Sequence, residues 1–323
     1  MREPEDWRPS ASLDLIRFRA LLLAQLRAWF AEHGLIEVET PVLSSAAVTD
    51  PNLHSLATRV DDRGYYLHTS PEYCMKRLLA SGSGDIYQIC RVFRDSELGR
   101  RHNPEFTMVE WYRLGFGVHE FIDELESLLT VLADGRRELA PARRLSYRSL
   151  FLEYAGIDPF DCGVDELVVC LERNAVPLPA GLENDFDGLL DLLLASTIEP
   201  ALPADAPVFV FDFPPSQAAL ARIRDDQPPV AERFELFLGG MELANGFHEL
   251  ADPGEQSRRF QQDLQRRADV GLPCAPVDQR FLAALDAGLP DCSGVALGLD
   301  RLVMWLADCN DIAEVLSFDL GRA

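Results

Sequence analysis

The spacing of apolar positions first predicts an amphipathic helix near the N-terminus. Over residues 12–33, Leu22 and other large apolar residues recur at helical intervals. Ser12 can cap the start of this helix, and Gly34 follows its end. A short strand that ends at a proline is expected next, over residues 34–41.

A two-residue alternation predicts a hairpin further along the chain. Residues 86–94 and 106–112 are rich in β-branched and aromatic residues, which is typical of strands. Between them lie a glycine, a histidine and arginines that include Arg94, and arginine matches phosphate or carboxylate well. Alternation puts these side chains on one face of the second strand: Phe106, Met108, Glu110 and Tyr112. The pattern predicts a site for an anionic ligand, and the alternative is an ordinary hairpin with a solvated tip.

A second hairpin is predicted around a Gly239-Gly240 turn. The expected cross-strand pairs are Leu238 with Met241, Phe237 with Glu242, and Glu235 with Ala244. Glu235 and Glu242 then lie diagonally on one face, with their backbones roughly 7–8 Å apart. Two such carboxylates suit Mg²⁺ that also binds ATP phosphates, and the alternative is two solvated glutamates. Strict alternation would place Asn245 and Glu249 on the opposite face, although Asn245-Gly246 is a turn or bulge signal.

The remaining segments add helices and one more strand-to-helix unit. We expect a short helix over residues 70–80, and a mostly helical segment over 117–205 with breaks at 176–181 and 200–207. A strand is expected over residues 208–213. The C-terminal run 294–305 predicts a buried, glycine-containing strand and then a helix with Arg301 in its first turn.

Composition narrows the class of protein. The 323 residues carry a net charge of −23, which argues against a nucleic-acid footprint spread over the surface. Seven cysteines without a C-x-x-C pair fit a reducing compartment better than a disulfide framework or a zinc site. Residues 1–6 do not look like a signal peptide, and the apolar stretches are too short to cross a bilayer. We therefore expect a soluble, cytoplasmic protein with no membrane partner.

Three segments together resemble motifs 1, 2 and 3 of the class II aminoacyl-tRNA synthetases: residues 34–41, 92–106 and 294–305. Residues 70–72, 101–106 and 242–250 resemble the lysyl branch in finer detail. The resemblance implies an α+β fold with an antiparallel sheet flanked by helices. It implies one catalytic domain over residues 1–323, with a helical insertion at about 117–205 and no anticodon-binding domain. It also implies a homodimer through the first helix, whose pattern fits packing on its own core equally well.

The same resemblance implies site residues for ATP, an amino acid and Mg²⁺. It assigns ATP binding to Arg94, Asp95, Ser96, His102, Asn103, Phe106, Glu242, Leu243, Gly298 and Arg301. It assigns the amino acid to Ser70, Pro71, Glu72, Glu110, Tyr112, Asn245, Glu249 and Ala296. Glu235 and Glu242 would hold Mg²⁺, and Arg94, Arg301 and Glu242 would support the chemistry, with Phe106 and Arg301 on either side of the adenine.

Two departures from the lysyl pattern refine the implied substrate. Asp95-Ser96 stands where lysyl synthetases have Asn-Glu, so the glutamate that reads adenine is displaced to Glu97 or lost. Ala296 replaces a glycine, and its methyl group narrows the amino-acid pocket. Alanine there is similar to the paralogous ligases, which implies activation of (R)-β-lysine and its transfer to a lysine of elongation factor P, without tRNA. The alternatives are a truncated lysyl-tRNA synthetase-like ligase and an inactive regulatory paralogue.

Overall fold

The computed structural model describes residues 7–274 and 276–323, and the N-terminal segment 1–6 read above lies outside the described residues. Its contacts divide the chain into two compact units. The first unit comprises residues 1–116, 131–137 and 250–323, and the second comprises 117–130 and 138–249. Both units combine strands with helices, so the predicted α+β class with mostly antiparallel strands is confirmed.

The first unit begins with the predicted N-terminal helix, α1 (Leu13–Glu32). Ser12 caps it by accepting a hydrogen bond from the Leu15 backbone N–H, as expected. The strand that follows, β1 (Ile36–Glu37), is much shorter than the predicted one.

Four strands of the first unit follow the order β1-β5-β6-β12, with β5 spanning Ile86–Phe93, β6 Glu105–Leu114 and β12 Cys292–Gly298. Strands β5 and β12 both pair with β6 in antiparallel register. The register puts Ala296 opposite Glu110, and Gln88 opposite Glu110 on the other side. The central strand β6 therefore carries a carboxylate in the middle of the sheet.

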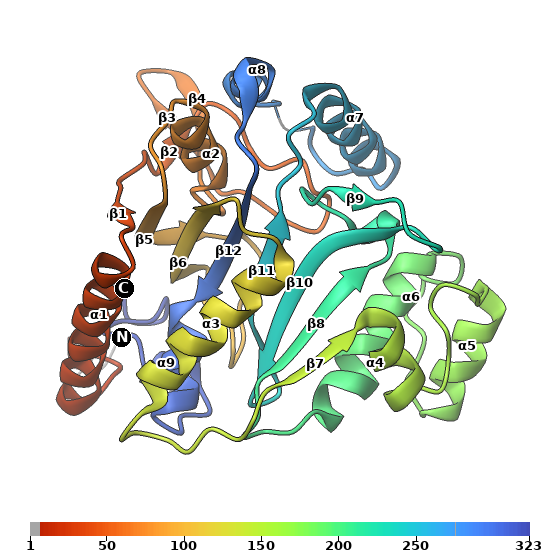
Figure 1. The fold of residues 1–323 in the computed structure, drawn as a ribbon, viewed down its shortest axis with the longest axis horizontal. Helices are drawn as coiled ribbons and strands as arrows, with labels where there is room; N and C mark the ends of the chain where they lie inside the picture. The colour runs from red at the N-terminus through yellow and green to blue at the C-terminus, as the bar shows by residue number, and fades with distance from the viewer. Residues whose placement is uncertain (1–6, 275) are drawn as a thin grey trace. The chain divides into compact units, whose positions relative to one another are not determined.

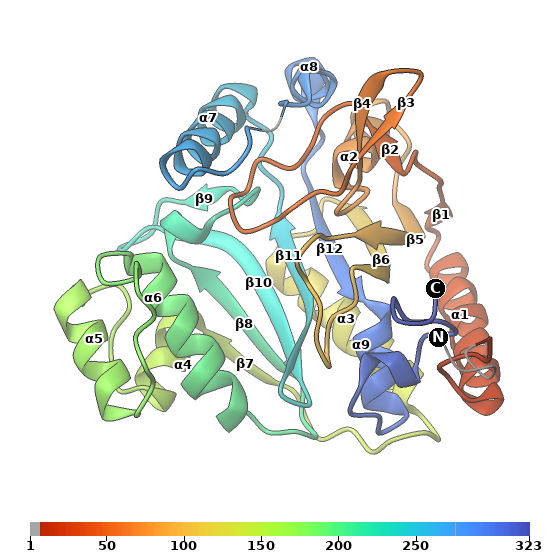
Figure 2. The same cartoon turned by 180° about the vertical axis from the view of Figure 1, so that it is seen from behind.

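Smaller elements complete the first unit. A three-stranded sheet contains β2 (Leu43–Ser44), β4 (Arg63–Leu67) and β3 (Ala57–Val60), in that order. The helices are α2 (Glu72–Ala80), α7 (Pro253–Asp269), α8 (Gln279–Gly288) and α9 (Leu299–Leu306), with a final 3₁₀ turn η4 (Ile312–Glu314). Figures 1 and 2 both show α2 beside the small sheet and α8 between the sheet and α7. Stacking of Tyr73 on Phe281 and contact of Tyr73 with Phe260 join these three helices.

The second unit contains a sheet with the strand order β11-β10-β8-β7, and β9 beside β10. Its strands are β7 (Arg143–Ser146), β8 (Val208–Phe213), β9 (Ile223–Arg224), β10 (Val230–Leu238) and β11 (Met241–His248). Strand β8 has the predicted bounds. Strand β7 lies inside the segment expected to be mostly helical, where it pairs with β8 in parallel.

Helices cover both faces of this sheet in the second unit, with α3 on the face of Phe211 and Phe234 and the other helices on the face of Val208 and Val210. They are α3 (Val118–Ala133, of which residues 118–130 belong to this unit), α4 (Tyr147–Tyr154), α5 (Val164–Arg173) and α6 (Phe186–Leu193). Short turns η1 (Leu194–Ile198), η2 (Glu199–Ala201) and η3 (Pro215–Gln217) follow. Buried apolar side chains of α4, α5 and α6 pack with those of β8 and β10 in one core cluster. Helices α4, α5 and α6 therefore share their core with strands of the same unit, and their reading as an insertion into one catalytic domain stays a prediction.

No helix within the described ranges is long and apolar enough to cross a membrane.

Candidate active site

A group of buried and partly buried polar side chains in the first unit forms one part of the predicted site. We call it the Glu110 cluster, and it consists of Ser70, Glu72, Lys76, Glu110 and Tyr112. The Tyr112 hydroxyl donates to Glu110 Oε1 at 2.7 Å, and the Ser70 hydroxyl donates to Glu110 Oε2 at 2.7 Å. The predicted parity of β6 is confirmed, since Glu110 and Tyr112 meet on one face.

The charge of the Glu110 cluster is unusual for a buried place. Glu110 is 2% exposed, and burial together with the nearby Glu72 raises its pKa from 4.5 to about 7. The hydrogen bonds from Ser70 and Tyr112 and the charge of Lys76 act in the opposite direction. Because its pKa lies near neutral pH, Glu110 can ionise when a substrate cation binds beside it.

Helix α2 places the other carboxylate of this cluster. The Glu72 backbone N–H donates to Ser70 Oγ at 3.0 Å, which fixes the start of the helix after Pro71. Four residues on, the Lys76 ammonium donates to Glu72 Oε1 at 2.6 Å. The sequence-based site included Ser70, Pro71 and Glu72 but missed Lys76, although the i,i+4 spacing on a predicted helix was a signal for it.

The loop between β5 and β6 carries several of the residues that are predicted to bind ATP. The Arg94 guanidinium lies over the Phe106 ring, 5.1 Å from its centroid, and pairs with Glu97 at 3.7 Å. Arg94 Nε is buried and has no hydrogen-bond partner among the described residues, so it is available to an anion. Asp95 accepts from the Ser96 backbone N–H, and Ser96 itself adopts a left-handed φ of 66°.

His102 and Asn103, which are also predicted to bind ATP, have different hydrogen-bond partners in this loop. His102 Nε2 lies 2.6 Å from an Arg301 guanidinium nitrogen. Asn103 is engaged at both ends by backbone, because its amide N–H donates to the Glu105 carbonyl and its oxygen accepts from the Leu320 N–H. The structure therefore gives Asn103 a role in shaping the loop, and a nucleotide contact by its side chain stays a prediction.

The start of α9 holds Arg301 in place. Gly298 is its N-cap residue, directly after β12. The next residue but one, Asp300, is buried, receives the Thr107 backbone N–H at 2.7 Å, and pairs with Arg19 of α1 at 2.5 Å. Arg19 and Asp300 were not predicted as site residues, and an acidic residue beside Arg301 was the only signal.

The Gly239-Gly240 hairpin of the second unit carries the predicted metal ligands. Both glycines have positive φ, and Phe237 pairs with Glu242 as predicted. The predicted pairing of Glu235 with Ala244 is wrong, because a bulge shifts the register and Glu235 pairs with Asn245.

The extra residue of the bulge is Leu243, and it corrects the expected facing of Asn245. Because Leu236 pairs with Ala244 and Phe237 with Glu242, Leu243 has no partner of its own in the register. Asn245 consequently lies on the Glu235 face, and its amide N–H donates to Glu235 Oε1 at 3.3 Å. By alternation Glu249 follows on the same face, so the expectation that Asn245 and Glu249 lie on the opposite face is wrong, and their contact with the amino acid stays a prediction.

Buried charge is concentrated around Glu235. Burial raises its pKa to about 7; Arg233 opposes this shift and Glu242 adds to it. Arg233 forms an ion pair with Glu235 and donates to the Gln217 carbonyl at 2.8 Å. On α6, burial raises the pKa of Asp191 to about 6, against the charge of Arg233. Arg233 was missed from sequence, although residues two apart on a strand share a face.

The oxygen donors of this hairpin fit a hard divalent cation. Glu235 and Glu242 supply carboxylates, and Asn245 Oδ1 is buried without a hydrogen-bond partner in the described chain. In the part of the chain that the structure describes, no three His, Cys, Asp or Glu side chains gather to hold a metal. Mg²⁺ usually takes only one or two protein carboxylates and completes its shell with water and phosphate, so the predicted metal site rests on Glu235 and Glu242 alone and stays a prediction.

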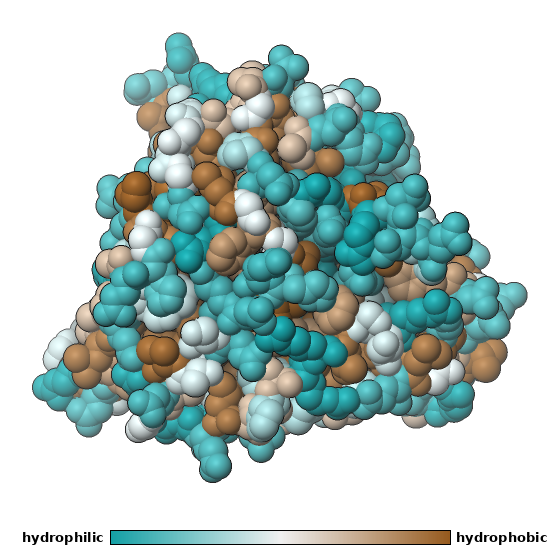
Figure 3. All heavy atoms as spheres, in the orientation of Figure 1, coloured by the Kyte–Doolittle hydropathy of each residue, from teal (hydrophilic) through white to brown (hydrophobic). Residues whose placement is uncertain are grey.

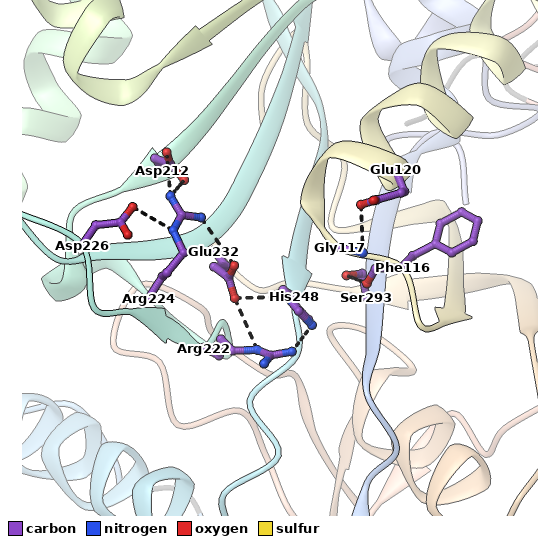
Figure 4. A network of polar contacts seen from close by, with 10 residues as sticks. All are labelled: Phe116, Gly117, Glu120, Asp212, Arg222, Arg224, Asp226, Glu232, His248 and Ser293. Atoms are coloured by element: carbon purple, nitrogen blue, oxygen red, sulfur yellow. Dashed lines mark hydrogen bonds and ion pairs between the residues drawn. The ribbon is translucent and has the colours of Figure 1, made fainter.

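A further network lies at the end of β11, around His248 (Figure 4). By alternation His248 lies on the opposite face of β11 from Asn245. His248 Nδ1 lies 3.0 Å from Glu232, and Arg222 contacts both residues. Arg224 extends the network to Asp212, Asp226 and Glu232. Together with the backbone N–H of Arg222, which donates to the His248 carbonyl, these contacts fix the strand end that precedes Glu249.

Comparison with known proteins identifies the family of this chain. The profile of the class II tRNA synthetases (D, K and N) matches residues 5–320. A protein of Vibrio vulnificus (strain YJ016) named elongation factor P–(R)-beta-lysine ligase is 47% identical over 319 residues, covering 97% of this chain and 98% of the relative. A protein of Salmonella typhi with the same name is 46% identical over 329 residues, covering 100% of both chains.

Proposed function

The chain belongs to the class II tRNA synthetases (D, K and N), whose members use ATP, and from this premise we propose that it is the ligase that attaches (R)-β-lysine to elongation factor P. The full-length similarity to relatives of that name supports the proposal. The single structural observation that carries it is the Glu110 cluster, a buried acidic group built to receive an ammonium.

The first step joins the amino acid to AMP. The substrate carboxylate attacks the α-phosphorus of ATP, the bond to the β-phosphate oxygen breaks, and pyrophosphate leaves. Arg94 is the candidate for the α-phosphate and substrate carboxylate, since its buried Nε lacks a partner in the described chain. Phe106 offers the aromatic surface for adenine, and Arg301 supplies a second guanidinium. Positioning and charge stabilisation then supply the rate acceleration.

The proposed Mg²⁺ ligands lie on the Gly239-Gly240 hairpin of the second unit. Glu235 and Glu242 would hold Mg²⁺, which supplies charge neutralisation to the phosphates when it is bound. Arg233 keeps Glu235 in place through its ion pair and its bond to Gln217.

The second step transfers the acyl group to a protein amine. The neutral ε-amine of a lysine on elongation factor P attacks the acyl carbon of the adenylate, AMP leaves, and an amide forms. A lysine with a pKa near 10.4 is only about 0.04% neutral at pH 7, so the acceptor amine must lose a proton as it reacts.

We also propose a homodimer through α1 and β1. Leu21 and Ile36 are 66% and 57% exposed, and Leu13 is 63% exposed, which is unusual for such large apolar side chains. Figure 3 shows hydrophobic residues among the mostly hydrophilic surface where Figure 1 places α1 and β1. Leu21→Glu should yield monomers in sedimentation velocity, and an unchanged sedimentation coefficient would refute this interface.

A pyrophosphate-exchange panel tests the proposed activity. The enzyme, ATP and labelled pyrophosphate are combined with (R)-β-lysine, (S)-β-lysine, L-α-lysine or no amino acid. The proposal predicts exchange that depends on the amino acid and is fastest with (R)-β-lysine. No exchange with any lysine isomer would indicate an inactive paralogue, and equal exchange with L-α-lysine would indicate a lysyl-tRNA synthetase-like enzyme.

A further inference from the structure

Lys76 is the only lysine of the chain, and its ammonium is buried, which is rare for a charged amine. The side chain of Lys76 is 0% exposed. The other 29 Lys and Arg positions of the chain are all arginines. The Lys76 ammonium donates to Glu72 at 2.6 Å and lies 5.8 Å from the centroid of the Phe281 ring. Helix α2 and helix α8 thus enclose a fixed positive charge inside the Glu110 cluster.

The charges of the cluster can be followed group by group. Helix α2 supplies Glu72 and Lys76, and β6 supplies Glu110 with the Tyr112 hydroxyl. Beside the cluster, β5 carries the Cys90 thiol. Burial raises the pKa of Cys90 to about 12, with Glu110 adding to the rise, so this thiol stays neutral. Tyr112 donates its proton in a hydrogen bond to Glu110. The charged forms that remain are two carboxylates and one ammonium.

This composition leaves the cluster one positive charge short when Glu110 is ionised. A buried carboxylate without a compensating cation is costly, so the cluster must take up either a proton or a cation from outside. A substrate ammonium is such a cation, and it is the one that the Glu110 cluster is proposed to bind. Without Lys76, two cations would be missing.

We propose that Lys76 is a positioning residue for amine recognition, a built-in ammonium that neutralises Glu72 and leaves Glu110 as the carboxylate that pairs with one substrate ammonium. This inference rests on the proposed function, because it assumes that the substrate is a lysine-like amino acid. Lys76 acts through the two glutamates and need not touch the substrate. It sets how many positive charges the pocket accepts, and so it contributes to specificity for a cationic side chain.

The inference predicts a particular pH profile for a variant that keeps the length of Lys76 but loses its charge. In Lys76→Met, Glu72 and Glu110 face each other without a counter-ion, so protons compete with the substrate up to a higher pH. KM for (R)-β-lysine should rise at least about tenfold at pH 7, since a neighbouring charge shifts a carboxyl pKa by about one unit or more. By about pH 9 the same KM should return to the wild-type value or fall below it.

The experiment measures kcat and KM for (R)-β-lysine in pyrophosphate exchange from pH 6 to 9. Arg77→Met is the matched control, because it removes a cation from the neighbouring position of α2 and should leave the profile unchanged. Lys76→Arg keeps the charge and should retain the wild-type pH dependence. If Lys76→Met does not fold, Lys76→Gln replaces it, since an amide can still donate to Glu72 but carries no charge.

Each outcome has a distinct meaning. A KM that rises at pH 7 and recovers at high pH, with kcat little changed, supports the inference. A KM that is raised equally at every pH, or is unchanged, overturns it and leaves Lys76 a purely structural residue. If the wild-type enzyme shows no exchange with (R)-β-lysine, the proposed function fails first, so the two failures can be told apart.

Discussion

Replacing Glu110 by glutamine should change the pH dependence of stability and not only the activity. The folded protein binds the Glu110 proton more tightly than the unfolded chain does, since its pKa is raised from 4.5 to about 7. The associated stability is therefore fully present below pH 4.5 and is lost as the pH rises through 7. At 1.36 kcal/mol per pKa unit, the raised pKa corresponds to a loss of about 3 kcal/mol.

Glu110→Gln removes this titration while keeping the shape of the side chain. Below pH 5 the variant should be about as stable as wild type, because the amide and the protonated carboxyl each present one donor group and one acceptor oxygen to the hydroxyls of Ser70 and Tyr112. Relative to wild type it should gain about 3 kcal/mol between pH 5 and pH 8. Substrate binding should weaken about 10- to 100-fold, as expected when a buried hydrogen bond between charged groups is lost.

Urea unfolding without ligands, followed from pH 4.5 to 8.5, measures this difference. Glu105→Gln is the control on the same strand, because Glu105 is half exposed and should leave the pH dependence as it is. The reasoning would be refuted if the free energy of unfolding of Glu110→Gln fell with pH as steeply as that of wild type. Glu235 and Asp191 also have raised pKa values, but they are present in both proteins, so their contributions to the pH dependence of stability cancel in the difference.

Three further outcomes are expected. Glu242→Ala should abolish pyrophosphate exchange, by more than about 100-fold, while circular dichroism and the unfolding midpoint stay near wild type; near-normal exchange would remove Glu242 from the metal site. Arg94→Met should lower exchange by about 100-fold or more through lost charge stabilisation, and a change confined to stability would contradict this role. Ala296→Gly should improve exchange with L-α-lysine relative to (R)-β-lysine, and an unchanged ratio of kcat/KM would show that the methyl group does not set the preference.

Sequence patterns predicted the local elements of the site well. Alternation placed Glu110 and Tyr112 on one face of β6, and the structure joins them by a hydrogen bond. Helical spacing and capping located α1 within a residue at each end. The Gly239-Gly240 turn gave the correct first pairs of its hairpin. Each of these depends on contacts close in sequence, where spacing determines geometry.

Contacts set by register and by distant segments were harder to predict. The bulge at Leu243 moved the partner of Glu235 by one residue; Asn245-Gly246 signalled a bulge or turn in this strand, but nothing at Leu243 marks its position. Strand β7 is short and lies within a helical segment, so its parallel pairing with β8 could not be read from alternation. The ion pair of Arg19 with Asp300 joins residues 281 positions apart, a distance over which spacing carries no information.

The most direct test follows the labelled amino acid to its acceptor. The enzyme is incubated with ATP, Mg²⁺ and labelled (R)-β-lysine, together with either purified elongation factor P or total tRNA, and the products are separated and the protein is analysed by mass spectrometry. The account predicts one added β-lysyl group on a single lysine of elongation factor P and no ATP-dependent label in tRNA. Charged tRNA beside an unmodified elongation factor P would contradict it.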